Sequence, residues 1–143
     1  MSSGASAARE EAVREQPRKG YAYNRTRQAF VASELTVADT HWSRFRGLLG
    51  TKRENFTSGQ GLWIVPCQGV HTLGMRFAID VIYLDNEMKV VHIEENVRPW
   101  RITPVRLKAA TVIEVPPHTI WETGTAVDDI IEIKVSKNGA AAA

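Results

Sequence analysis

Three residues whose side chains can bind a soft metal or act as nucleophile and base lie close together: Cys67, His71 and Met75. A metal centre ordinarily takes three or four protein ligands, and Cys67 and His71 are the only strong ones here. Cys67 and His71 also resemble a nucleophile–base pair, in which the imidazole lowers the pKa of the thiol. A third interpretation is a small buried cysteine beside a loop histidine that is hydrogen-bonded to backbone. The residue types favour this third interpretation and leave the other two open.

Other signatures of catalysis and cofactor binding are missing from the sequence. It has no glycine-rich phosphate loop, no Gly-x-Ser-x-Gly elbow, no His-Glu-x-x-His pair and no Cys-x-x-Cys pair. The single cysteine excludes an internal disulfide and a cysteine-only zinc site. We therefore predict no bound metal and no cofactor, and we consider an enzyme less favoured than a binding domain.

Asp80 stands inside a run of β-forming residues, Phe77 to Leu84. If both faces of that strand are covered, the carboxylate must be paired, hydrogen-bonded or protonated. Arg44, Arg76 and Arg101 are the possible cationic partners, and the amides of the loop after His71 are possible donors. A structural anchor is the favoured role, with a functional acid as the alternative.

Two arginine-containing segments complete the set of candidate binding residues. Arg44 can clamp a carboxylate bidentately, and Arg98-Pro99-Trp100-Arg101 can stack on an aromatic ligand or bind phosphate. We predict a shallow pocket for a small polar ligand or peptide. Its predicted residues are Arg44, Cys67, His71, Met75, Asp80 and Arg101.

Short β-rich runs separated by turns must position these residues, which predicts a mainly β, compact antiparallel sandwich or barrel-like domain with one or two short helices. The predicted strands are Gln28–Thr36, Leu62–Val65, Phe77–Leu84, Lys89–Glu94, Ala110–Val115 and Ile130–Val135. Asp85-Asn86-Glu87 predicts a hairpin turn. One helix is expected from a cap at Asp39 to Gly50, and a short helical turn after Pro116-Pro117 that ends near Gly124.

The 143 residues suit one domain, with 43% hydrophobic and 24% charged residues. Residues 1–27 carry six bases and three acids with few large apolar side chains, which predicts a disordered basic tail. Residues 28–136 then form the domain and 137–143 a frayed end. Because the domain is close to neutral, nucleic acid is not an expected partner. No apolar run is long enough to span a bilayer, and no secretory signal follows Met1, so the expected location is the cytoplasm.

Five stretches resemble one known family, called domain of unknown function 192 or uncharacterised protein family 0127. The stretches are Arg44-x-x-Gly47-Leu48-Leu49, Gly61-Leu62, His71 to Asp85, Arg98-Pro99-Trp100-Arg101 and Ile113-Glu114-Val115-Pro116. The resemblance covers Gln28 to Ile133. It implies a mainly antiparallel β-sandwich or barrel-like domain with a short helix and no established activity.

The sequence departs from the family pattern at several positions. Ala78 stands where members commonly have proline, while His118 and Asp128 stand where they usually have glycine. Other members often carry an export signal, so the resemblance makes association with the cell envelope an alternative location. The favoured function is a non-catalytic accessory or ligand-binding domain. The alternatives are an enzyme using Cys67 and His71, and a structural partner in a larger assembly.

Overall fold

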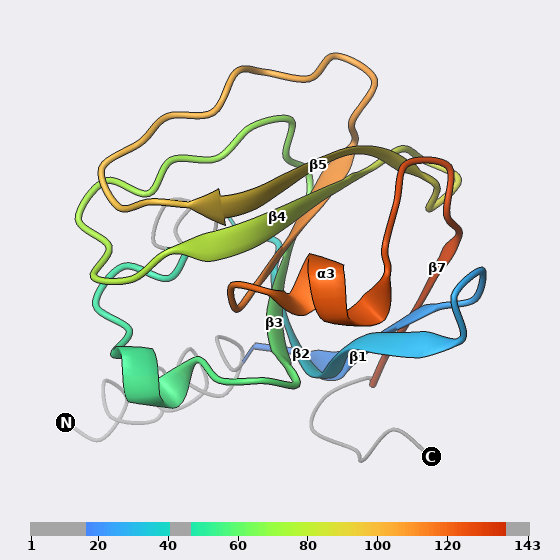
Figure 1. The fold of residues 1–143 in the computed structure, drawn as a ribbon, viewed down its shortest axis with the longest axis horizontal. Coiled ribbons are helices and arrows are strands. Elements are labelled where there is room, and N and C mark those ends of the chain that lie inside the picture. Colours follow the sequence, from blue (N-terminus) through green and yellow to red (C-terminus); the bar gives the residue numbers. More distant parts are fainter. Residues whose placement is uncertain (1–16, 41–46, 137–143) are drawn as a thin grey trace, which may run out of the picture.

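The computed structural model describes residues 17–40 and 47–136, which are organised around one seven-stranded sheet (Figure 1). The strands are β1 (Lys19–Asn24), β2 (Ala29–Ala38), β3 (Gln60–Ile64), β4 (Ile79–Leu84), β5 (Val90–Val97), β6 (Thr111–Val115) and β7 (Ile131–Val135). Their order across the sheet is β5-β4-β6-β3-β2-β1-β7. The mainly β fold that the sequence predicts is confirmed.

The sheet curls into a half-barrel whose two edge strands approach each other at one end. Lys89, just before β5, forms a β-bridge with Ile130, just before β7, and the amide of Val90 donates to the carbonyl of Asp129 at 2.9 Å. Neighbouring strands are antiparallel except β2 and β3, which run parallel. This parallel pair departs from the predicted antiparallel arrangement, because the chain leaves β2 and returns through a long connection before β3.

Two apolar cores pack on the two faces of the sheet. The inner core fills the curl, where Leu35, Ile82 and Ile113 meet Ile120 of the short helix α3 (Thr119–Thr123). The outer core packs Val81 and Tyr83 against long connecting segments. All six residues of β4 are buried, as expected for a strand covered on both faces.

Strand β1 extends the ordered domain into the predicted tail of residues 1–27. It pairs with β2 on one side and β7 on the other, with Tyr23 opposite Phe30. The predicted boundary at Gln28 misses this strand because its buried positions are the small Ala22 and the polar Asn24. Strand β1 has too few apolar side chains to hold it in the sheet by burial, so its pairing with β2 and β7 stabilises it instead.

The helical predictions have mixed outcomes. The predicted turn after Pro117 is α3, which ends at Gly124 in a left-handed conformation. The predicted helix from Asp39 to Gly50 lies largely outside the described residues, and residues 47–50 form a turn. A 3-10 helix, η1 (Arg53–Asn55), follows it and has no counterpart among the predictions.

His118 and Asp128 both have left-handed backbone, with φ of 74° and 77°. Side chains other than glycine rarely adopt this conformation. Glycine, which the family resemblance implies for both positions, would adopt this geometry without that cost. His118 and Asp128 therefore store strain in the two turns.

Candidate functional site

Two connecting segments on the outer face, residues 67–75 and 98–109, are held together by two buried threonines. The hydroxyl of Thr72 donates to the carbonyl of Arg98 at 2.6 Å and accepts from the amide of Arg101 at 2.8 Å. The hydroxyl of Thr103 donates to the carbonyl of Val70 at 3.1 Å and accepts from the backbone amide of Val70 at 2.9 Å. The segment that carries Cys67, His71 and Met75 is therefore fastened to the segment that carries Arg101.

Cys67 is half-buried at the edge of the outer core. Its thiol donates to the carbonyl of Gly69 at 3.0 Å, and its amide donates to the carbonyl of Ala110 at 2.9 Å. These two bonds hold Cys67 against the backbone of its own segment and of the segment before β6.

His71 and Met75 lie on the same segment but in different surroundings. His71 is half-buried and forms a β-bridge with Ile102, whereas Met75 is 5% exposed and belongs to the outer core. Between them, Thr72 to Met75 form a tight turn in which Gly74 has a φ of 79°. A turn with positive φ at its third position requires glycine, which accounts for the Thr-Leu-Gly-Met sequence.

Asp80 is fully buried, and both of its carboxylate oxygens accept backbone hydrogen bonds. Oδ1 accepts from the amide of Asn96 at 2.8 Å, and Oδ2 accepts from the amide of Ile120 at 3.0 Å. The donors thus come from the end of β5 and the start of α3, and not from the loop after His71. None of the ion pairs between described residues joins Asp80 to an arginine. Asp80 therefore fastens the helix inside the curl of the sheet.

These positions divide the predicted pocket. Asp80 contacts Ile120, which belongs to the inner core, whereas Cys67 and Met75 pack in the outer core on the other face of the sheet. The side chain of Arg101 is exposed, and Arg44 lies outside the described residues. The structure brings Cys67, His71, Met75 and the backbone of Arg101 into one loop layer and separates Asp80 from them.

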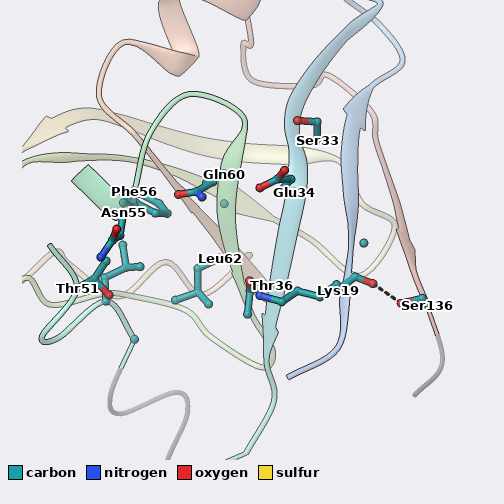
Figure 2. A pocket seen from close by; sticks show the side chains of 14 residues that line it. Lys19, Ser33, Glu34, Thr36, Thr51, Asn55, Phe56, Gln60, Leu62 and Ser136 are labelled. Carbon is teal, nitrogen blue, oxygen red and sulfur yellow. Dashed lines mark hydrogen bonds between the residues drawn. The ribbon is translucent and has the colours of Figure 1, made fainter. Parts of the chain in front are cut away.

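A cleft of about 730 Å³ lies elsewhere, between the β1–β2–β3 part of the sheet and the segment around η1 (Figure 2). The sheet side of the cleft carries Lys19 on β1, Ser33, Glu34 and Thr36 on β2, and Gln60 on β3, while Asn55 of η1 lies on the other side (Figure 2). Phe56 and Leu62 supply buried apolar surface to its floor. The remaining lining residues are Gly20, Gly47, Leu48, Thr51, Gly61 and Ser136.

Several polar groups of the cleft are already oriented by hydrogen bonds. The ammonium group of Lys19 donates a hydrogen bond to the hydroxyl of Thr36 at 2.8 Å. The side-chain oxygen of Gln60 accepts one from the backbone amide of Thr57 at 3.2 Å. The Gln60 amide nitrogen and the exposed carboxylate of Glu34 take no part in those two bonds. The sequence did not indicate this site, because its residues lie far apart along the chain and form no motif, although Ser33, Glu34 and Thr36, polar residues within a predicted strand, were a signal.

A buried acid lies next to the floor of the cleft. Glu114 on β6 stands directly opposite Leu62 on β3, so the two side chains share a face of the sheet. Glu114 is 3% exposed, and no described group bonds its Oε2 atom. Burial raises the pKa of Glu114 to about 8, so the carboxyl group is mostly protonated at pH 7.

Tyr83 is a second buried titratable group in the outer core. Its hydroxyl donates to Thr103 at 2.8 Å, and burial is the main cause that raises its pKa to about 12.

Within the part of the chain that the structure describes, no three His, Cys, Asp or Glu side chains are arranged to hold a metal ion. No helix among the described residues is long and apolar enough to cross a bilayer.

The fold and the site define a small β half-barrel domain without an assigned activity. The model of the family called domain of unknown function 192, an uncharacterised family, matches residues 22–133, and the chain belongs to that family. A UPF0127 protein of Thermococcus sibiricus is 30% identical over 123 residues, which cover 82% of this chain and 77% of the relative. A UPF0127 protein of Pyrococcus furiosus is 30% identical over 114 residues, covering 76% and 94% of the two chains.

The fold also occurs in a solved structure. A protein of unknown function from Novosphingobium aromaticivorans matches with a TM-score of 0.67 and 17% identity, over 81% of this chain and 83% of the other. At that identity the likeness concerns the fold alone. The family resemblance stated from the sequence is confirmed, and neither the family nor this structural neighbour has a known function.

Proposed function

We propose that the protein is a non-catalytic binding domain that holds a small polar ligand in the cleft of Figure 2. The observation that carries this proposal is the lining, in which polar donors and acceptors, among them the neighbouring strand residues Glu34 and Gln60, surround an apolar floor. Binding sites for small molecules commonly combine a few oriented polar groups with apolar walls in this way. An amino acid or a short peptide fits this description, because it carries a cation, an anion and apolar surface.

Glu34 and Gln60 are the side chains expected to orient the ligand. The exposed carboxylate of Glu34 can accept from an ammonium group, and the amide nitrogen of Gln60 can donate to a carboxylate or carbonyl. Phe56 stacks on Phe77, with ring centroids 5.7 Å apart, and so offers a firm floor. This support does not depend on Cys67 or His71.

The alternative enzyme hypothesis for Cys67 and His71 makes a different prediction. It requires a thiolate near neutral pH, whereas a binding domain with the cleft of Figure 2 places no such requirement on Cys67. The rate of alkylation by iodoacetamide, measured against pH, separates the two. A thiol that titrates near its ordinary pKa of about 8.5 or above supports the binding domain, and one that titrates below about 7 supports the enzyme.

Ligand binding can be tested by thermal unfolding in the presence of single amino acids, dipeptides and small carboxylates. A compound that binds only the folded chain raises the melting temperature, and the stabilisation grows with the logarithm of its concentration relative to Kd. We expect Glu34→Gln to weaken the affinity for a stabilising compound about tenfold. Glu87→Gln, in the exposed β4–β5 turn, should leave that affinity unchanged. Amide NMR shifts confined to β2 and residues 55–62 would support the cleft, while shifts confined to residues 67–75 would contradict it.

A further inference from the structure

Segment 98–108 exposes four large apolar side chains, which we call the apolar rim. The exposed fractions are 66% for Trp100, 73% for Ile102, 63% for Val105 and 84% for Leu107. Single exposed apolar residues are common on protein surfaces, but four within eight residues of one segment mark an interaction surface. None of the four lines the cleft of Figure 2.

The apolar rim is interleaved with positive charge. Its basic residues are Arg98, Arg101, Arg106 and Lys108, and residues 96–113 contain no acid. Arg106 lies 3.6 Å from the carboxylate of Glu94 on β5. The other three are exposed, and no salt bridge between described residues involves them. The surface therefore presents apolar groups and cations together.

The backbone of the rim is held in place before any partner arrives. Besides the bonds of Thr72 and Thr103, the amide of Arg106 donates to the carbonyl of Gln68 at 2.8 Å. The side-chain amide of Gln68 donates to the carbonyls of Leu107 and Ala109 at 3.3 and 3.1 Å. Docking this segment consequently costs little backbone entropy.

We propose that the apolar rim docks on the surface of a lipid bilayer that carries anionic headgroups. Trp100 and Leu107 would enter the interfacial region, while Arg98 and Lys108 would face the headgroup phosphates. Charge complementarity favours an anionic surface. Figure 1 shows the segment as the outermost arc above β5, a shape that suits a broad surface more than a peptide in a groove.

Co-sedimentation of the full-length chain with lipid vesicles tests this proposal. We expect it to bind vesicles of phosphatidylcholine with about one third phosphatidylglycerol, and to bind pure phosphatidylcholine vesicles at least about tenfold more weakly. The double variant Ile102→Ser with Leu107→Ser should partition onto the anionic vesicles about tenfold more weakly. The double variant Arg98→Gln with Lys108→Gln should show a loss of about the same size. Because these side chains are exposed, circular dichroism and melting temperature should stay at the parent values.

Trp121→Ser is the matched control, because Trp121 is 78% exposed but lies on α3. Its partitioning should equal that of the parent. All variants keep the basic residues before β1, so binding caused by those residues alone would be equal in every variant and would overturn the proposal. A dimer in sedimentation velocity that the Ile102→Ser and Leu107→Ser pair abolishes, with no vesicle binding, would also overturn it in favour of a second copy of the chain.

Discussion

Asp129 and Glu114 are two acids with almost equal solvent exposure and opposite electrostatic behaviour. Asp129 is 2% exposed beside the start of β7, and Glu114 is 3% exposed in the middle of the sheet. The pKa of Asp129 is lowered, while that of Glu114 is raised to about 8. Low solvent exposure alone therefore does not decide whether an acid in this fold is charged.

The difference lies in the donors within reach of each carboxyl group. Burial is the largest single effect at Asp129 and would raise its pKa, but hydrogen bonds from Arg27, Asn24 and the amide of Ala126, each at 2.9 Å, together outweigh it. At Glu114, desolvation by burial is the one cause acting on the pKa, and it raises it. Loops and strand ends still have unused donors, whereas the amides of a central strand are already paired with neighbouring strands.

Asp80 extends this comparison and should show the largest mutational effect. Asp80→Ala would leave the amides of Asn96 and Ile120 buried without acceptors, which should cost about 2 to 4 kcal/mol of unfolding free energy. Asp80→Asn keeps one acceptor oxygen and should cost less. Urea unfolding of the two variants measures both values. An Asp80→Ala protein as stable as the parent would remove Asp80 from the class of structural anchors.

Asp129→Ala should cost about 2 kcal/mol, chiefly through the donors of Asn24 and Ala126. The Arg27 side chain is 44% exposed, so solvent screens its ion pair and it adds little. Because the folded pKa of Asp129 lies below the ordinary value of 3.8, the contribution is complete above about pH 4 and is lost as the pH falls through the folded pKa. Unfolding curves at pH 7 and pH 3 should differ less for the variant than for the parent.

Glu114→Met should stabilise the protein by about 2 kcal/mol at pH 6 and by more at pH 8, because it replaces a buried acid, whose Oε2 no described group bonds, with an apolar side chain of similar size. The folded pKa of about 8 exceeds the ordinary value of 4.5, so the parent loses stability as the pH rises between these values. At pH 4 the two proteins should be nearly equal. Parent stability that stays level from pH 5 to pH 8.5 would show that Glu114 has donors as Asp129 has.

His118→Gly should produce the smallest change, a gain of about 0.5 kcal/mol. Glycine relieves the strained φ of 74°, and its greater freedom in the unfolded chain offsets part of that gain. Glu122→Gly, inside α3, is the matched control and should lose about 1 kcal/mol. Differential scanning calorimetry compares the two. A loss at His118 similar to the loss at Glu122 would show that the left-handed turn stores no strain.

The strands were the most predictable part of the molecule. Apolar runs such as Phe77–Leu84 and Ala110–Val115 coincide with β4 and β6 within two residues, and the Asp85-Asn86-Glu87 turn joins β4 to β5 as expected. Strand β1 escaped prediction because pairing with β2 and β7, and not its own apolar content, holds it in the sheet. Likewise, the apolar neighbours of Asp80 in the sequence predicted that it is buried, but they did not predict that the amides of Asn96 and Ile120 donate to it.

The sequence by itself determined the class of the fold, the buried strand around Asp80 and the family, because alternation and motif spacing are local properties of the chain. Only the tertiary structure decided that Asp80 and Cys67 occupy opposite faces of the sheet, and that residues from β1, β2, β3 and η1 form a cleft. It also decided which buried acids keep their charge. Each of these outcomes depends on groups distant in sequence, such as Asp80 and Ile120, whose approach is set by how the sheet curls.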